Sequence, residues 1–283
     1  MTRNLTSIGD VRKALEALGV RPNRGLGQNF LVERGILDVL VRAADLQPED
    51  NILEIGAGLG VLTEELLATV SSVYAVELDK RLFQHLSKEH GEHPKLTLIQ
   101  DDALNLDIPA LLGTGINKVV ANLPYSVGSR LVVDIVQASS APARIVTMLQ
   151  LEVAERLAAK PGTKEYNAIS IWSQYRYDVS VAHVVSPKCF WPRPEVTSAI
   201  VKFVKLDAPR AECNDESLLF EITKLAFQYR RKQLATTLKS APGRLQQKPE
   251  KTRQILEELG LDPQIRPERL TVEQWCALCN RLS

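Results

Sequence analysis

The feature that most constrains the fold is a regular alternation of short apolar runs with helical stretches, beginning at residue 51. The apolar runs predict five strands, at 51–55, 72–77, 95–100, 117–122 and 144–150. Four of these runs lead into helical patterns, at 62–69, 81–90, 130–138 and 153–159. Because strands joined by crossover helices pair in parallel, this order predicts an α/β fold with an open, mostly parallel sheet covered by helices.

The chain changes character after about residue 176. Residues 177–185 and 197–205 are rich in β-branched side chains, and the prolines between them exclude a helix. We expect these two segments to form a late antiparallel strand pair at the edge of the sheet. From about residue 207 onward the pattern is helical, which predicts a small all-α C-terminal domain. The predicted domains are therefore 1–206 and 207–283.

Composition excludes several classes of protein. Hydrophobic residues make up 45% of the 283 residues and charged residues 24%, as in ordinary globular proteins that bury a core. No apolar run approaches the roughly 20 residues that a membrane helix needs, and the first residues lack the apolar centre of a secretory signal. We therefore expect a cytoplasmic protein with no membrane partner.

The four cysteines do not indicate a disulfide framework in a chain of this length. Cys276 and Cys279 have the CxxC spacing, but no second CxxC and no His pair lies near them in the sequence. Apolar neighbours such as Trp275 and Leu278 indicate a buried helical face. We expect two core cysteines there, and no metal site.

Positive charge is concentrated near the C-terminus. The net charge of the chain is +1, yet residues 224–253 contain nine basic residues and only one acidic residue, Glu250. The nine are Lys224, Arg230, Arg231, Lys232, Lys239, Arg244, Lys248, Lys251 and Arg253. Such a one-sided segment favours contact with a phosphate backbone, although a solvated helix face is the alternative.

A glycine-rich turn follows the first predicted strand and opens a helix. Gly56, Gly58 and Gly60 give the spacing GxGxG, which differs from the GxGxxG of dinucleotide sites. Glu77 ends the second strand and Asp102 follows the third. A carboxylate at the position of Glu77 can accept hydrogen bonds from both ribose hydroxyls. A carboxylate at the position of Asp102 can accept one from the adenine amino group. The combination predicts an adenosine-containing ligand at the carboxyl edge of the sheet; a turn that only packs a helix on its strand is the alternative.

This pattern resembles the Rossmann-like S-adenosylmethionine-dependent methyltransferases, whose first motif has an acidic residue before GxGxG. The acidic residue here is Glu54. The resemblance implies that Glu54 supports the methionine end of S-adenosylmethionine and that Gly56 lies against the cofactor.

Asn122, Leu123, Pro124 and Tyr125 follow the fourth strand directly, beside the predicted pocket. An exocyclic adenine amine is a poor nucleophile because its lone pair is delocalised into the ring. Two acceptors on its hydrogens would pull the nitrogen towards a tetrahedral geometry. The Asn122 side-chain oxygen and the Leu123 carbonyl could supply them, since Pro124 fixes the turn. Catalysis of methyl transfer would then be mostly positioning and dipole placement.

Aromatic side chains are expected to hold the base. Tyr125 offers a ring on which a displaced base can stack, and Phe190, in a proline-stiffened segment, could supply a second ring. A core position is the alternative for Phe190.

Together these motifs are similar to those of one family, the small-subunit ribosomal RNA adenine N6,N6-dimethyltransferases, over nearly the whole chain. The motifs that carry the resemblance are Arg24–Leu31, Asn122–Tyr125, Gln150–Leu157, Pro161–Tyr166, Phe227–Leu234 and Pro267–Leu270. It implies that Asn29, Leu31 and Asn122 line the cofactor pocket. Positions Ser186, Glu195 and Thr197 depart from the family's usual pattern, but none is a proposed catalytic group.

The resemblance implies a methyltransferase that uses S-adenosylmethionine to dimethylate two adjacent adenines near the 3′ end of small-subunit (16S) ribosomal RNA. The expected substrate is the assembling small ribosomal subunit, bound by a monomer through the helical domain. Two alternatives stay open: a large-subunit ribosomal RNA adenine N6-methyltransferase, and a non-catalytic assembly or RNA-binding factor.

Overall fold

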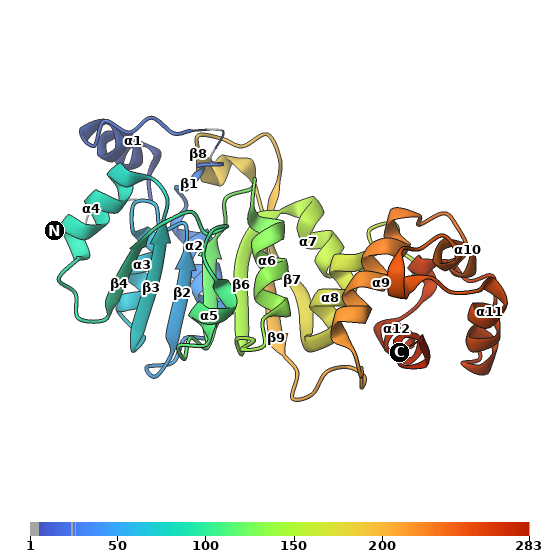
Figure 1. Ribbon diagram of the computed structural model, residues 1–283. Helices are drawn as coiled ribbons and strands as arrows, with labels where there is room; N and C mark the ends of the chain where they lie inside the picture. The colour runs from blue at the N-terminus through green and yellow to red at the C-terminus, as the bar shows by residue number, and fades with distance from the viewer. Residues whose placement is uncertain (1–5, 24, 26, 283) are drawn as a thin grey trace. The chain divides into compact units, whose positions relative to one another are not determined.

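The computed structural model describes residues 6–23, 25 and 27–282 (Figure 1). Arg24 and Leu26 of the N-terminal motif lie outside these residues. The chain divides into two compact units. The first holds the described residues up to 154 together with 179–205, and the second holds 155–178 together with the described residues from 206 onward.

A seven-stranded sheet forms the centre of the first unit, in the order β4-β3-β2-β5-β6-β9-β7 within the described residues. Its strands are β2 (Asn51–Ile55), β3 (Ser72–Glu77), β4 (Leu96–Gln100), β5 (Lys118–Asn122), β6 (Arg144–Gln150), β7 (Tyr177–Val185) and β9 (Ser198–Lys205). β2 to β6 pair in parallel. β9 runs antiparallel to β6, pairing Arg144 with Val204 and Gln150 with Ser198. The predicted, mostly parallel sheet is confirmed, and the two late segments form neighbouring strands at its edge, with β9 antiparallel to β6.

Helices cover the sheet, and its central strands β2, β5 and β6 are largely buried (Figure 1). The helices are α2 (Arg34–Ala44), α3 (Val61–Leu67), α4 (Lys80–His90), α5 (Ile108–Leu112), α6 (Gly128–Gln137) and α7 (Leu151–Leu157), the last of which crosses the unit boundary. The β2 residues Ile52 and Leu53 point to opposite faces, yet both are completely buried. This burial on both faces explains why the strands read as continuous apolar runs.

A small second sheet joins two distant segments of the first unit. β1 (Phe30–Leu31) pairs antiparallel with β8 (Phe190–Trp191), so that Leu31 lies opposite Phe190. α1 (Ile8–Ala17) packs in the same region, where its residue Val11 shares a hydrophobic cluster with Trp191. A short 3₁₀ turn, η2 (Pro187–Cys189), precedes β8, and the Ser186 hydroxyl caps it by accepting from the Lys188 N–H at 3.3 Å.

The second unit is helical. It contains α8 (Ala168–Arg176), α9 (Glu216–Gln228), α10 (Leu234–Lys239), α11 (Pro249–Glu258) and α12 (Val272–Leu282), with 3₁₀ turns η3 (Gly243–Leu245) and η4 (Pro267–Arg269). The expected single boundary near residue 206 differs from this division, because 155–178 pack with the helices. Tyr166 is fully buried there, and its hydroxyl donates to the Leu270 carbonyl at 3.0 Å.

The structure confirms the expectation about the paired cysteines of the helical unit. Cys276 and Cys279 are fully buried in the helical unit, as predicted. Among the residues that the structure describes, no helix is both long and apolar enough to cross a membrane. The same residues include no cluster of three or more His, Cys, Asp or Glu side chains arranged to hold a metal ion.

Candidate functional site

A cavity of about 350 Å³ lies at the carboxyl edge of the sheet in the first unit. It is lined by every residue predicted from the sequence to bind a cofactor, namely Asn29, Leu31, Gly56, Glu77, Asp102 and Asn122. Leu123, Pro124 and Tyr125 line the same cavity. Phe190 is not among the lining residues. The fold therefore brings the predicted cofactor-binding residues and the predicted catalytic residues of the Asn122–Tyr125 turn to one cavity.

The glycine turn between β2 and α3 forms one wall of the cavity. Gly56, Gly58 and Gly60 have φ values of +80°, +61° and +85°, in the left-handed region that side chains disfavour. A Cβ atom on Gly58 would stand 3.5 Å from the ring of Phe30. The turn thus exposes bare backbone to the cavity, which allows a ligand to approach closely.

Glu77, at the end of β3, is tied to this turn. Its Oε2 accepts from the Gly58 N–H and its Oε1 from the Asp79 N–H, both at 2.8 Å. Burial raises the pKa of Glu77, while the backbone N–H bonds from Asp79 and Gly58 lower it. Each carboxylate oxygen has a further lone pair, so the side chain can still accept from a ligand hydroxyl.

Glu54 lies deeper in the same wall. Its side chain is 1% exposed, and Oε2 accepts from the Thr63 hydroxyl at 2.7 Å. Burial raises the pKa of Glu54 to about 8; the hydrogen bond from Thr63 lowers it and the nearby Glu77 raises it. A cation entering the cavity would favour the ionised form of this carboxyl group.

Asp102 follows β4 and borders the cavity from the side of the next strand. It is partly exposed, and its Oδ1 accepts from the Leu104 N–H at 2.9 Å. This local bond fixes one carboxylate oxygen and leaves acceptor capacity on the other.

The Asn122–Tyr125 turn lies across the cavity and packs against the N-terminal segment. The Asn122 amide nitrogen donates to the Asn29 carbonyl at 3.4 Å, which leaves its Oδ1 as a free acceptor position. Gly27 has φ +66°, and a Cβ atom there would stand 3.1 Å from the Tyr125 nitrogen. The segment before β1 therefore approaches the turn so closely that glycine is required.

The Tyr125 side chain is held by contacts to its hydroxyl and to its ring. Its hydroxyl hydrogen-bonds the hydroxyl of Ser198, a fully buried residue of β9. Burial raises the pKa of Tyr125, whereas the bond from Ser198 lowers it. The Phe190 ring packs edge-on against the Tyr125 ring, with centroids 6.5 Å apart and an interplanar angle of 75°. The sequence carried no signal that singled out Ser198.

The expected role of Phe190 as a second stacking ring is not met in this structure. Phe190 is 2% exposed and belongs to the core cluster that also contains Leu31 and Ile200. Pairing of β8 with β1 buries it, because its partner in the register is the buried Leu31. Its ring supports Tyr125 from the side instead of offering a face to the cavity.

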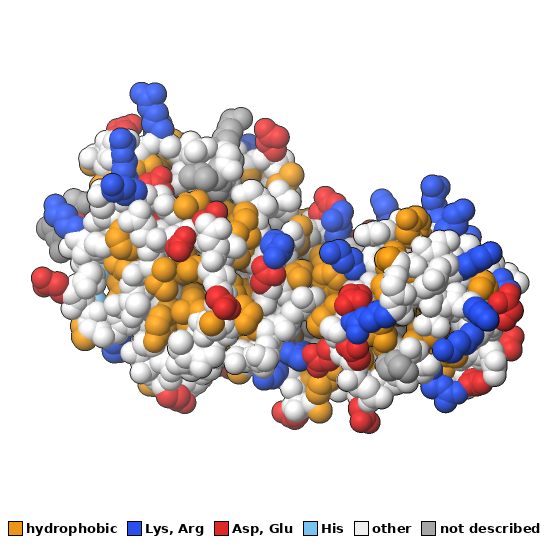
Figure 2. All heavy atoms as spheres, in the orientation of Figure 1, with side chains coloured by type: hydrophobic (Ala, Val, Ile, Leu, Met, Phe, Trp, Pro, Cys, Tyr) orange, Lys and Arg blue, Asp and Glu red, His pale blue; other side chains and the backbone are white. Residues whose placement is uncertain are grey.

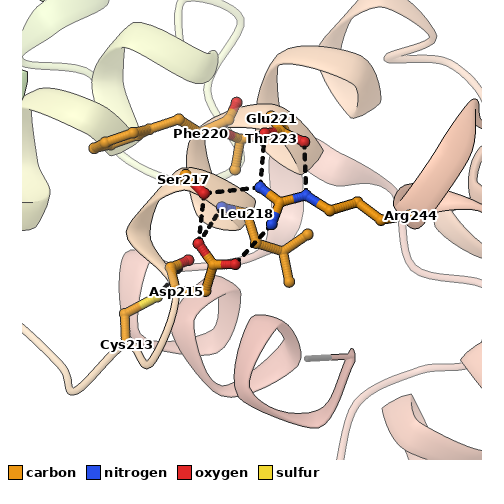
Figure 3. Close-up of polar contacts among 8 residues, drawn as sticks. All are labelled: Cys213, Asp215, Ser217, Leu218, Phe220, Glu221, Thr223 and Arg244. Carbon is orange, nitrogen blue, oxygen red and sulfur yellow. Dashed lines mark hydrogen bonds and ion pairs between the residues drawn. The ribbon is translucent and has the colours of Figure 1, made fainter.

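The predicted basic set lies on the helical unit, and two of its nine members are engaged within the protein. Arg244 pairs with Asp215 at 2.8 Å and with Glu221 at 2.6 Å, and it also donates to the Ser217 hydroxyl (Figure 3). Arg230 donates to the carbonyls of Thr163, at 2.8 Å, and Lys164. These two arginines therefore anchor their own unit.

The other seven basic side chains are exposed, and none is within ion-pair distance of a carboxylate in the described part of the chain. They are Lys224, Arg231, Lys232, Lys239, Lys248, Lys251 and Arg253. We call these seven residues the basic surface. Figure 2 shows Lys and Arg side chains gathered where α10 and α11 lie.

Comparison with known proteins decides the family. The model of the family described as ribosomal RNA adenine dimethylase matches residues 19–283. The chain belongs to this family. The protein named ribosomal RNA small subunit methyltransferase A in Clostridium acetobutylicum is 37% identical over 274 residues, which cover 96% of this chain and 98% of that protein.

Two solved structures share the fold. A dimethyladenosine transferase from Plasmodium falciparum superposes with a TM-score of 0.76 at 24% identity, covering 88% of this chain and 95% of that one. A 23S rRNA methyltransferase superposes with a TM-score of 0.68 at 23% identity, covering 90% and 99%. The likeness to both confirms the Rossmann-like methyltransferase architecture.

Proposed function

We propose that this family member transfers methyl groups from S-adenosylmethionine to the N6 atoms of two adjacent adenines near the 3′ end of small-subunit ribosomal RNA. The product would be N6,N6-dimethyladenosine, made during maturation of the small ribosomal subunit. The observation that carries the proposal is that the Asn122–Tyr125 turn opens into the same cavity as Glu77 and Asp102. The name of the Clostridium acetobutylicum relative supports the small subunit as the source of the RNA.

The cavity fits S-adenosylmethionine by the chemistry of its walls. Glu77 would accept from the ribose hydroxyls and Asp102 from the adenine amino group, while Gly56 lets the backbone lie against the ligand. Glu54 is the buried carboxyl group suited to the ammonium at the methionine end. Asn29 and Leu31 would close the cavity from the N-terminal segment. S-adenosylmethionine supplies the electrophilic methyl group and the leaving group.

The Asn122–Tyr125 turn would bind the acceptor adenine. The Asn122 Oδ1 and the Leu123 carbonyl accept from the N6 hydrogens, so that the nitrogen lone pair is drawn out of conjugation and towards the methyl group. Both acceptors are fixed before the reaction, Asn122 by its bond to the Asn29 carbonyl and Leu123 by burial. The Tyr125 ring, held by Ser198 and Phe190, gives the base a rigid stacking surface.

The RNA itself would be held by the basic surface on the helical unit. Its seven side chains lack carboxylate partners in the described residues, so they are free to replace counterions along a phosphate backbone. The proposed partner is therefore an RNA of the assembling small subunit, with the base delivered to the cavity of the first unit.

The decisive test is methylation of small ribosomal subunits that lack adenine dimethylation. Purified protein, labelled S-adenosylmethionine and these subunits should give N6,N6-dimethyladenosine, detected by mass spectrometry of digested RNA. The Asn122→Ala variant should form product at least about a hundredfold more slowly, which is the usual loss when one positioned transition-state hydrogen-bonding group is removed. Its affinity for S-adenosylmethionine, measured by calorimetry, should fall only modestly.

The matched control is Asn105→Ala. Asn105 is an exposed asparagine close to Asp102 in the chain, and this variant should keep full activity. Full activity of Asn122→Ala would contradict the proposed mechanism. Product formed only when large ribosomal subunits replace the small ones in this assay would favour the large-subunit alternative. Cofactor binding without any product would favour a non-catalytic factor.

A further inference from the structure

Three of the four cysteines converge in the helical unit, far in sequence from the cavity residues. Cys276 and Cys279 are one helical turn apart on α12 and both are fully buried. Cys213 lies in the segment before α9 and is only partly buried. All three belong to one hydrophobic cluster with Trp275. Of these three cysteines, Cys213 is therefore the one that is not fully buried.

Asn280 holds the Cys213 segment against α12. Its side-chain oxygen accepts from the Asn214 N–H at 2.8 Å, and its amide nitrogen donates to the Glu212 carbonyl at 2.9 Å. These two bonds bracket Cys213 from either side in the chain. Since Asn280 follows Cys279 directly, these two hydrogen bonds hold the Cys213 segment against the part of α12 that carries Cys279.

The other end of the segment is fixed as well (Figure 3). Asp215 caps α9 by accepting from the Leu218 N–H at 2.9 Å, and Arg244 pairs with the same carboxylate. Cys213, in its thiol form, donates to the Asp215 carbonyl, with the sulfur 3.5 Å from the oxygen. Cys213 is thus anchored on both sides.

The thiols differ in acidity because of where they lie. The Cys279 thiol donates to the Cys213 sulfur, which lowers the pKa of Cys213 and raises that of Cys279. Burial raises the pKa of Cys276 to about 12. The fourth cysteine, Cys189, lies in the first unit, and burial raises its pKa. Cys213 is therefore the thiol best able to ionise: the hydrogen bond from Cys279 lowers its pKa most, and one from Cys276 lowers it further.

We propose that Cys213 is a modification site for hydroperoxides and that Cys279 resolves the product as an intramolecular disulfide. The Cys213 thiolate attacks the peroxide, the O–O bond breaks, and the sulfur becomes a sulfenic acid while water or an alcohol leaves. The Cys279 sulfur then attacks the Cys213 sulfur, the S–O bond breaks, and water leaves with the Cys279 proton. Two electrons pass from the two sulfurs to the peroxide.

A metal is the other ligand class that clustered thiolates attract, and the structure does not support it. No described group of three or more His, Cys, Asp or Glu side chains has an arrangement that would hold a metal ion. Glu216, whose charge raises the pKa values of Cys213 and Cys276, is paired with Arg176 and accepts from the Tyr175 hydroxyl at 3.2 Å. A disulfide needs only two sulfurs, and Cys213 and Cys279 belong to the same cluster.

The test uses the reduced, full-length wild-type protein and compares its own cysteines. Iodoacetamide at pH 7 should alkylate Cys213 about tenfold faster than Cys189, because thiolate is the reacting form. After treatment with an equimolar amount of hydrogen peroxide, peptide mapping without reduction should find Cys213 joined to Cys279 and Cys189 unmodified. Dithiothreitol should restore the free thiols.

Variants identify the order of the steps. In Cys279→Ser, dimedone should trap a sulfenic acid on Cys213, whereas in Cys276→Ser the disulfide should form as in the wild type. Cys213 left reduced while Cys189 oxidises, or a disulfide between Cys213 and Cys276, would overturn the proposal. The wild-type mapping and alkylation rates decide the matter even where a variant fails to fold.

Discussion

Glu54 combines nearly complete burial with a place on the wall of the cavity. Its pKa of about 8 means that, without a cation beside it, this carboxyl group is mostly protonated at neutral pH. The positively charged ammonium of S-adenosylmethionine favours the carboxylate, so binding should expel a proton below about pH 8. We predict that affinity rises with pH up to about 8 and then levels off, as measured by calorimetry in buffers of different ionisation enthalpy.

The Glu54→Gln variant should remove most of this pH dependence and most of the proton release, leaving the smaller contribution of Glu77, whose pKa is also raised. Glu89→Gln, a change at an exposed carboxyl group, is the control and should leave both unchanged. The raised pKa of Glu54 also affects stability when no cofactor is bound. As pH rises from 4.5 towards about 8, the Glu54 carboxyl ionises in the unfolded chain before it ionises in the folded protein, so the free energy of unfolding falls. An unaltered pH profile in Glu54→Gln would refute the assignment.

Sequence and structure agree at the residues that end strands. Gly56, Glu77 and Asp102 could be located in advance because parallel strands bring their carboxyl ends to one edge. Phe190 could not, because its burial depends on β8 pairing with the distant β1. The contact of Tyr125 with Ser198 likewise joins residues 73 positions apart. Contacts between residues so far apart in the chain leave no pattern in the sequence around either residue.

At the scale of elements, the glycine turn between β2 and α3 is a place where the backbone itself is specialised. Gly60 has φ +85°, and a Cβ atom there would stand 2.9 Å from a methyl group of Leu86 and 3.5 Å from His90. Gly35, by contrast, lies in the first turn of α2 without a positive φ, and a Cβ atom there would make only an ordinary contact, 3.8 Å from Glu33 Oε1.

We predict opposite effects for the same substitution at these two glycines. Gly60→Ala should destabilise the protein by about 1–3 kcal/mol, from left-handed strain and the contact with Leu86. Gly35→Ala should stabilise it by about 0.5–1 kcal/mol, because alanine loses less backbone entropy in a helix. Urea unfolding of both variants measures the free energies, and equal effects would contradict the assigned backbone roles.

Element boundaries were predictable where hydrophobic periodicity is strong and were missed where the elements are short or lie outside the repeat. The runs at 51–55, 72–77 and 144–150 are strands with those bounds. The helices α1, α2 and α5 were not predicted. α5 has only five residues and contains a proline, so its apolar pattern resembles a turn.

At the scale of the whole molecule, the basic surface and the cavity belong to different compact units. Charge counting alone grouped Arg244 with the other basic residues, because a sequence does not show that three side chains from α9 and its cap engage it. The structure separates basic residues that bind RNA in the proposal from those that hold the fold.

We predict that replacing Lys248, Lys251 and Arg253 by alanine weakens binding to small-subunit RNA mainly through its salt dependence. Each lost phosphate contact should lower the slope of log affinity against log salt by about 0.7–0.9. Fluorescence anisotropy at several salt concentrations gives the slope. Lys88→Ala, a change at an exposed lysine on α4, should leave it unchanged. Equal slopes for the triple variant and the wild type would exclude these three residues from the RNA contact.

The division of the chain into units has a consequence for its biosynthesis. Residues 155–178 emerge from the ribosome before β9, yet they pack with helices from beyond residue 206. β9 itself lies between β6 and β7 in the sheet, so β7 has no neighbour on that side until β9 has been made. The Tyr166 hydroxyl has its hydrogen-bond partner, the Leu270 carbonyl, only after a further 104 residues have been translated. Each unit is built from two separate segments of the chain, so neither can finish folding until its second segment has been synthesised. Until then, the apolar surface of each first segment stays without its partner in the nascent protein.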